Sequence, residues 1–112
     1  MNPGPFAELK NRQREMWASF APTAMFTTPV AGHLVKFAQV APGEAVLDVG
    51  TGTGVVAITA ARAGAKVTAL DLTPALLEHA RENASIARRD DIAWTEGDAE
   101  KLPYPDASFD VV

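Results

Sequence analysis

Hydrophobic residues in the first part of the chain recur at the spacing of amphipathic helices. Two helices are predicted, over residues 6–19 and 28–39. Thr28 is predicted to cap the second helix, with Pro29 in its first turn. We therefore expect residues 1–40 to form a helical segment that leads into a separate domain and acts as its lid.

From residue 41 onward, short apolar runs alternate with helical segments. Strands are predicted at residues 45–49, 66–70, 92–95 and 109–112, and helices at residues 53–63 and 74–87. Strands joined by helices in this way form right-handed parallel units, and the carboxyl ends of the strands share one edge of the sheet. The predicted fold is α/β: a Rossmann-like, three-layer α/β/α domain over residues 41–112, with a parallel sheet and an end within its fourth strand.

The helix predicted from residue 74 has the clearest signals. Thr73 precedes it as a cap and Pro74 occupies its first position. Its apolar residues are predicted to face the sheet; they are Leu76, Leu77, Ala80, Ala84 and Ala87.

A glycine-rich turn joins the first predicted strand to the next helix, in the sequence Val46-Leu47-Asp48-Val49-Gly50-Thr51-Gly52-Thr53-Gly54. Its glycines allow positive φ angles and let a ligand approach the backbone, although a tight turn without a ligand has the same composition. A dinucleotide site has the pattern G-x-G-x-x-G, but here Val55 occupies the last position and Gly54 comes one residue early. Asp48 would repel a pyrophosphate and attract an ammonium or sulfonium group. The turn therefore favours a cationic cofactor.

Two further carboxylates follow the next two predicted strands. Asp71 stands about twenty residues after the first glycine, where a carboxylate can accept hydrogen bonds from both ribose hydroxyls. Its alternative role is to cap the following helix, for which Thr73 is the better candidate. Asp98, with a neighbouring amide, can bind an amino-pyrimidine edge, although loop carboxylates are usually only solvated. Because all these residues end parallel strands, we expect them to meet.

Three segments together resemble successive motifs of class I S-adenosylmethionine-dependent methyltransferases: Val46–Gly54, Ala69–Pro74 and Glu96–Val112. The most similar group is the small-molecule type that resembles the ubiquinone and menaquinone biosynthesis methyltransferases. The resemblance implies that the methionine part of the cofactor lies on Asp48, Gly50, Thr51, Gly52 and Gly54, the ribose on Asp71, and the adenine on Leu72, Asp98 and Ala99.

The resemblance implies an enzyme that transfers a methyl group from S-adenosylmethionine to a small-molecule acceptor and leaves S-adenosylhomocysteine. Two alternatives stay open: an NAD(P)-dependent oxidoreductase, and a catalytically silent nucleotide-binding or interaction module. This family usually has a seven-stranded sheet, so we expect a shortened or partial chain that carries the cofactor-binding half. Residues 109–112 would then be an exposed strand edge, and a homodimer is expected there.

Composition narrows the possible partners and locations. The 112 residues are 47% hydrophobic and 21% charged with a formal net charge of −4, so there is no excess of cations for nucleic acid. The sequence has no cysteine, no apolar run long enough to span a bilayer and no visible secretory signal, and it is interpreted as cytoplasmic. His33 and His79 lie apart from other ligand-type residues, and no metal site is predicted.

Three aromatic residues in the first part of the chain have two interpretations. Trp17, Phe20 and Phe26 either cover the cofactor as part of a lid or form core beneath the first helix. Core is favoured, since buried aromatic residues are the commoner case.

Overall fold

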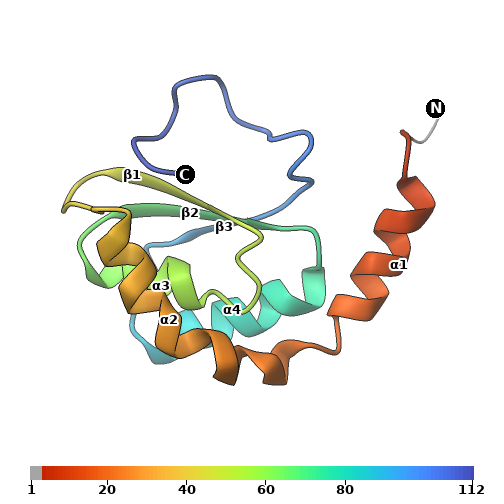
Figure 1. Cartoon of the computed structure of the whole chain (residues 1–112), viewed down its shortest axis with the longest axis horizontal. Coiled ribbons are helices and arrows are strands. Elements are labelled where there is room, and N and C mark those ends of the chain that lie inside the picture. The colour runs from red at the N-terminus through yellow and green to blue at the C-terminus, as the bar shows by residue number, and fades with distance from the viewer. Residues whose placement is uncertain (1–3) are drawn as a thin grey trace.

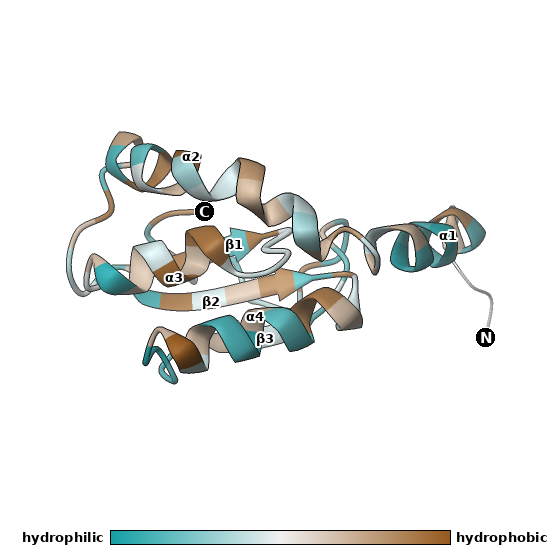
Figure 2. Ribbon diagram, turned by 90° about the horizontal axis from the view of Figure 1, so that it is seen from below, coloured by the Kyte–Doolittle hydropathy of each residue, from teal (hydrophilic) through white to brown (hydrophobic). Residues whose placement is uncertain are grey.

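The computed structural model describes residues 4–112, which form a parallel sheet with helices against one of its faces (Figure 1). Figure 2 shows helices α2, α3 and α4 side by side over the sheet, with α1 extending away from them. In chain order, the helices and strands are α1 (Ala7–Trp17), the 3-10 turn η1 (Ala21–Thr23), α2 (Ala24–Phe37), β1 (Ala45–Val49), α3 (Val55–Arg62), β2 (Lys66–Asp71), α4 (Pro74–Ile86) and β3 (Ala93–Glu96).

The three strands are parallel and follow one another in the order β1-β2-β3. Val46 is opposite Val67 in the first pair, and Thr68 is opposite Ala93 in the second. The chain then crosses the face that the helices leave open and returns beside β1, where Val111 forms a parallel bridge with Val46 (Figure 1). The direction in which new strands are added therefore reverses at β1, which is where open α/β sheets bind ligands.

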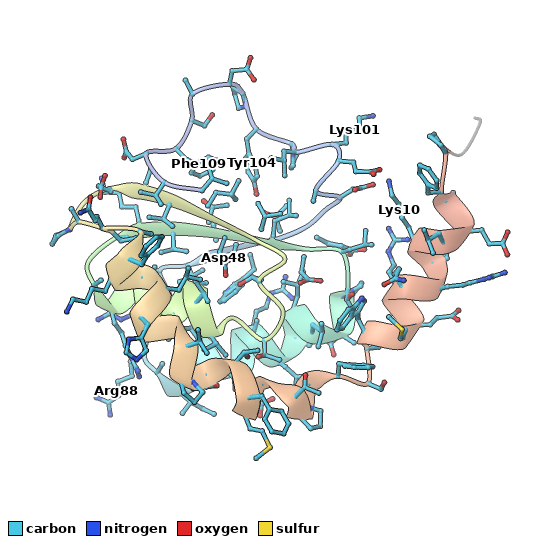
Figure 3. The ribbon with its side chains drawn as sticks, in the orientation of Figure 1. Lys10, Asp48, Arg88, Lys101, Tyr104 and Phe109 are labelled. Carbon is cyan, nitrogen blue, oxygen red and sulfur yellow. The ribbon has the colours of Figure 1, made fainter. Side chains whose placement is uncertain are left out.

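The fourth predicted strand is reduced to this one bridge. Val111 makes the two bonds of a parallel bridge: its amide donates to the Ala45 carbonyl at 3.2 Å, and its carbonyl accepts from the Leu47 amide at 2.9 Å. The Asp110 amide also donates to the Ala45 carbonyl, at 2.8 Å. The Asp110 carboxylate accepts a bond from the Ala45 amide at 2.8 Å and occupies the start of β1. Nearby, the rings of Tyr104 and Phe109 meet edge to face at 5.2 Å on the open side of the sheet (Figure 3).

Small apolar residues form much of the core between the sheet and its helices. Ala57 on α3, Ala69 on β2 and Ala80 on α4 are all fully buried. Alanine at these positions lets helix and strand backbones approach closely. The inner face predicted for α4 is confirmed, because Leu76 and Leu77 are buried there as well.

Helix α2 begins earlier than predicted. It starts at Ala24, directly after η1, and Pro29 lies inside it. Thr28 is therefore not a cap: its hydroxyl donates to the Ala24 carbonyl at 2.7 Å, within the helix. A Thr-Pro pair is typical of a helix start, but η1 already begins this helix, so Pro29 lies in its interior. Proline has no amide hydrogen to donate, and the helix continues without that one hydrogen bond. No helix within residues 4–112 combines the length and apolar character needed to cross a bilayer.

Helix α1 forms near its predicted bounds but contributes nothing to the core. None of its residues is buried, and Leu9 and Met16 are exposed despite their amphipathic spacing. Polar contacts with other parts of the chain therefore hold this helix in place.

A test of the close packing after β3 uses Gly97. A β-carbon there would lie 2.7 Å from Cδ1 of Leu70, whose side chain is fully buried. Gly97→Ala is expected to lower the free energy of unfolding by about 1–3 kcal/mol, as overpacking does, in urea denaturation. Gly32→Ala is the control, because a β-carbon at Gly32 meets nothing within 4 Å and alanine favours α2. Equal destabilisation by both changes would contradict this account.

Candidate functional site

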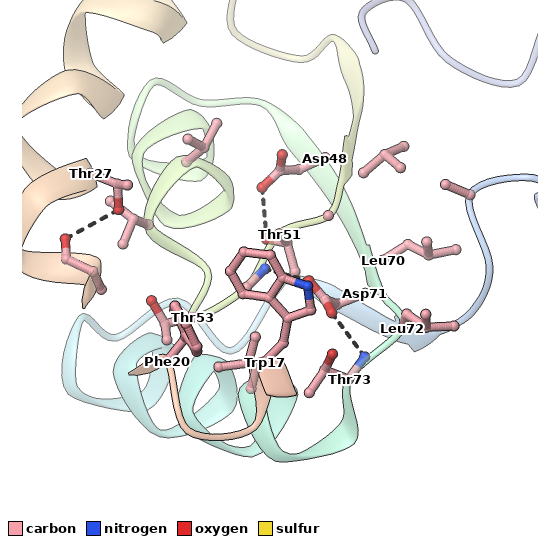
Figure 4. Close-up of a pocket in the computed structure, with 18 of the residues that line it drawn as sticks. Trp17, Phe20, Thr27, Asp48, Thr51, Thr53, Leu70, Asp71, Leu72 and Thr73 are labelled. Carbon is pink, nitrogen blue, oxygen red and sulfur yellow. Dashed lines mark hydrogen bonds between the residues drawn. The ribbon is translucent and has the colours of Figure 1, made fainter. Parts of the chain in front are cut away.

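A cleft of about 620 Å³ opens at the carboxyl edge of the sheet, beside the ends of β1 and β2 (Figure 4). Four parts of the chain line it: the turn after β1, the end of β2 with the start of α4, the loop after β3, and the segment from α1 to α2. The lining includes eight of the nine residues proposed to contact a cofactor, namely Asp48, Gly50, Thr51, Gly52, Asp71, Leu72, Asp98 and Ala99.

The glycine turn is anchored to β2 by its backbone. The amides of Gly50 and Thr51 both donate to the Leu70 carbonyl, at 2.8 and 3.0 Å. Gly50 and Gly52 have φ angles of 71° and 59°, and a β-carbon at either position would meet nothing within 4 Å. Their conformation favours glycine, and the space beside their backbone is open.

Gly54 has a different role from the one expected. It is the N-cap residue of α3, with a φ of 84°, and it is not among the residues that line the cleft. A β-carbon at Gly54 would lie 2.7 Å from the Trp94 ring and 3.2 Å from the Ala80 side chain. The early third glycine therefore lets the turn pack against β3 and α4, and its contact with a cofactor stays a prediction.

Asp71 connects the glycine turn to helix α4. Its Oδ2 accepts a bond from the Gly52 amide at 2.8 Å, and its Oδ1 accepts one from the Thr73 amide at 2.9 Å. Thr73 is the N-cap residue as predicted, but its side chain makes no capping bond. Asp71 therefore caps helix α4 with its side chain, which is the role that the sequence favours less. Each carboxylate oxygen can accept a second bond, so a role toward a ligand is compatible with it.

Asp48 is partly buried beside the turn, and the side chain that hydrogen-bonds to it is uncharged. The Thr51 hydroxyl donates to Oδ2 of Asp48 at 2.7 Å. Burial raises the pKa of the Asp48 carboxyl, and the negative charge of Asp71 acts in the same direction, while the bonds from Thr51 and the Ala57 backbone oppose the shift. A cation bound in the cleft would favour the ionised carboxylate.

Asp98 lies between two hydrogen-bonding partners. Its Oδ1 accepts a bond from the Glu100 amide at 2.9 Å, and its Oδ2 pairs with Nζ of Lys10. The Lys10 ammonium is the main cause that lowers the pKa of Asp98. Nε of Arg14 donates to the Leu72 carbonyl at 3.1 Å. Helix α1 therefore contacts both loops that carry the residues proposed for adenine.

The segment from α1 to α2 supplies one wall of the cleft. Trp17 and Phe20 line it, with ring centroids 4.9 Å apart, and they are 43% and 38% exposed (Figure 4). The core interpretation of these two residues is therefore wrong, while their role in a lid over a cofactor stays a prediction. Phe26 is 75% exposed and belongs to neither core nor cleft lining.

Four lining residues of this wall were not identified from the sequence; they are Gln13, Thr23, Ala24 and Thr27. The amide oxygen of Gln13 accepts a bond from Nε1 of Trp17 at 2.8 Å. Residues four apart on a helix share a face, so the pair could have been found by that spacing.

Metal-ligand side chains do not gather anywhere in residues 4–112: no group of three His, Cys, Asp or Glu residues is placed to hold an ion. His33 and His79 are both exposed. The chemical groups of the cleft are thus carboxylates, hydroxyls, open backbone and aromatic rings.

Comparison with known proteins identifies the family. Residues 46–112 match the methyltransferase domain family. A demethylmenaquinone methyltransferase of Tropheryma whipplei is 47% identical over 79 residues, covering 69% of this chain and 31% of that protein. An uncharacterized protein of Mycobacterium tuberculosis is 43% identical over 102 residues, covering 88% and 37%. The crystal structure of an RNA methyltransferase from Salinibacter ruber with S-adenosyl-L-homocysteine is 32% identical with a TM-score of 0.62, covering 66% and 50%.

The chain belongs to the methyltransferase domain family, and its resemblance to class I S-adenosylmethionine-dependent methyltransferases is confirmed. The Rossmann-like α/β fold class is confirmed as well. The chain spans 31% and 37% of the lengths of the two curated relatives.

The raised pKa of Asp48 gives a test of the site without ligand. Because folding favours the protonated carboxyl, the ionised form subtracts stability at neutral pH, and that loss disappears as the pH falls through the raised pKa. Asp48→Asn is therefore expected to raise the free energy of unfolding at pH 7, with a gain that vanishes toward acidic pH. Urea denaturation across this pH range measures the difference. Asp106→Asn, at an exposed position, is the control; a gain independent of pH would contradict the assignment.

Proposed function

We propose that this chain carries the S-adenosylmethionine-binding half of an enzyme that methylates a small molecule. The observation that carries the proposal is the meeting of Asp48, Asp71 and Asp98 in one cleft, from the ends of three successive strands. The relation to methyltransferases supports the choice of cofactor.

The methionine part of the cofactor is assigned to the glycine turn and Asp48. Gly50 and Gly52 leave space beside their backbone, and Asp48 supplies a desolvated carboxylate whose hydrogen-bonding side chain, Thr51, is neutral. Such a carboxylate suits an ammonium or sulfonium cation better than a phosphate. Gly54 is left out of this set, because it packs against Trp94 instead.

The nucleoside is assigned to the next two strand ends. Each oxygen of the Asp71 carboxylate accepts one bond from a backbone amide and can accept a second. These second bonds would come from the ribose hydroxyls. Leu72 would pack on the adenine, and Asp98 with Ala99 would contact the adenine edge. These residues line one continuous cleft, as a single extended ligand requires.

Bound S-adenosylmethionine supplies an activated methyl group on its sulfonium, which a nucleophilic atom of the acceptor displaces in line. The protein then contributes alignment and exclusion of water. Trp17 and Phe20 are placed to limit the access of water, since both rings line the cleft (Figure 4). Residues 1–40 are accordingly assigned as lid and lead-in to the cofactor-binding half at 41–112.

Calorimetry with S-adenosylhomocysteine and with NAD separates the proposal from its alternatives. S-adenosylhomocysteine is expected to bind and NAD to show no binding, because Val55 replaces the last glycine of the dinucleotide pattern and Asp48 repels a pyrophosphate. Binding of NAD alone would favour an oxidoreductase. Binding of neither would favour a silent interaction module.

The ribose contact can be tested with a change on each partner. Wild-type protein is expected to bind 2′,3′-dideoxy S-adenosylhomocysteine at least about 10-fold more weakly than the parent compound, as for hydrogen bonds to a charged group. Asp71→Asn keeps the side-chain size but removes the charge and replaces one of the two acceptor oxygens by a donor, so the penalty for the dideoxy compound should shrink. Calorimetry of all four combinations measures the coupling. An unchanged penalty in the variant would place the ribose elsewhere.

Partner and location remain proposals of the same kind. The net charge of −4 supports a small-molecule acceptor rather than nucleic acid, and the lack of cysteine is compatible with a cytoplasmic location. Homodimer formation is proposed through residues 109–112, which pair with β1 through the bridge between Val111 and Val46.

Light scattering over a range of concentrations tests this association. The chain is expected to form dimers, and Val112→Lys to weaken them, because a charge on an exposed strand edge opposes pairing. A monomer at high concentration would overturn the proposal.

A further inference from the structure

Helix α1 is attached to the rest of the molecule through two cations on one of its faces. Nζ of Lys10 contacts the carboxylates of Asp98 and Glu100, the second at 2.7 Å, and Nε of Arg14 donates to the Leu72 carbonyl at 3.1 Å. Lys10 and Arg14 are four residues apart and so lie on the same side of the helix. No residue of α1 is buried, so these polar contacts are what positions it.

The two attachment points are the loops assigned to adenine. Leu72 follows β2, and Asp98 follows β3. Both line the cleft. The same helix places Gln13 and Trp17 in the cleft wall. One helix therefore joins the two adenine loops to each other and to the lid.

We propose that Lys10 and Arg14 are positioning residues for the nucleoside: they hold the loops at Leu72 and Asp98 in register and keep Trp17 over the cleft. The inference rests on the proposed function, because it takes adenine as the group bound between these loops. Neither side chain is assigned a contact with the cofactor. Lys10 orients the carboxylate that would read the adenine edge, and Arg14 fixes the backbone beside Leu72.

The two contacts differ in their response to salt. The Lys10 contacts are ion pairs at a partly exposed position, and such pairs are screened as ionic strength rises. The Arg14 contact is to a neutral carbonyl and is less sensitive. Adenosine is an uncharged ligand, so salt does not screen a charge on it. A salt-dependent affinity for adenosine would therefore report on the protein.

The binding experiment is calorimetry with adenosine between about 0.01 and 1 M NaCl, over which the Debye length falls from about 30 to about 3 Å. Wild-type affinity is expected to fall several-fold with salt. At low salt, Lys10→Met should bind adenosine several-fold more weakly than wild type, and its affinity should fall little further as salt is added. Lys10→Arg keeps the positive charge and should show the wild-type affinity and salt dependence. Arg14→Met should weaken binding with the salt dependence retained. Arg12→Met is the matched control, since within residues 4–112 Arg12 pairs only with Glu8 on its own helix.

Hydrogen exchange without ligand gives a second readout. Amides of α1 are expected to exchange faster in Lys10→Met and in wild type at high salt, with α4 unchanged. Unaltered exchange of α1 overturns the attachment by Lys10, whatever the ligands do. Wild-type affinity for adenosine equal to that of Lys10→Met at all salt concentrations overturns its effect on the nucleoside. Failure of wild type to bind either adenosine or S-adenosylhomocysteine overturns the proposed function itself, while the exchange data still decide the attachment.

Discussion

The shape of the cleft depends on the two backbone amides that bind the Asp71 carboxylate. One amide belongs to Gly52 in the turn after β1, and the other to Thr73 at the start of α4. Asp71 is only 8% exposed, so water competes little for these charge-assisted bonds, which are roughly twice as strong as neutral ones. The carbonyl of Leu70, the preceding residue, accepts hydrogen bonds from two amides of the same turn. The end of β2 therefore fixes the glycine turn.

Patterns confined to one element predicted much of this fold. Strand β1 has the predicted bounds and α4 begins at Pro74 as expected, because a buried apolar run and a Thr-Pro helix start are local signals. The same Thr-Pro signal misplaced the start of α2 at Thr28, since the preceding η1 turn had already begun the helix. The packing of Gly54 against Trp94 could not be predicted in this way, because it is a contact between distant segments.

The candidate site was predictable where topology gathers residues and not where α1 covers them. Parallel strands bring Asp48 and Asp71 to one edge whatever their separation along the chain. The place of Trp17, in contrast, depends on Lys10 meeting Asp98, 88 residues away. No periodicity within α1 records that contact, so the preference of aromatic residues for the core led to the wrong interpretation.

The three carboxylates of the cleft differ in how the chain compensates their charge, and this difference indicates where a cation belongs. Asp71 is bound by two backbone amides, and Asp98 is paired with Lys10. Asp48 has the Thr51 hydroxyl and no cationic partner within residues 4–112, and its burial disfavours the ionised form. A ligand with a positive charge near the glycine turn would offset this cost, whereas a pyrophosphate would increase it. The charge balance of the cleft itself therefore favours an ammonium or sulfonium group beside Asp48, independently of the family to which the chain belongs.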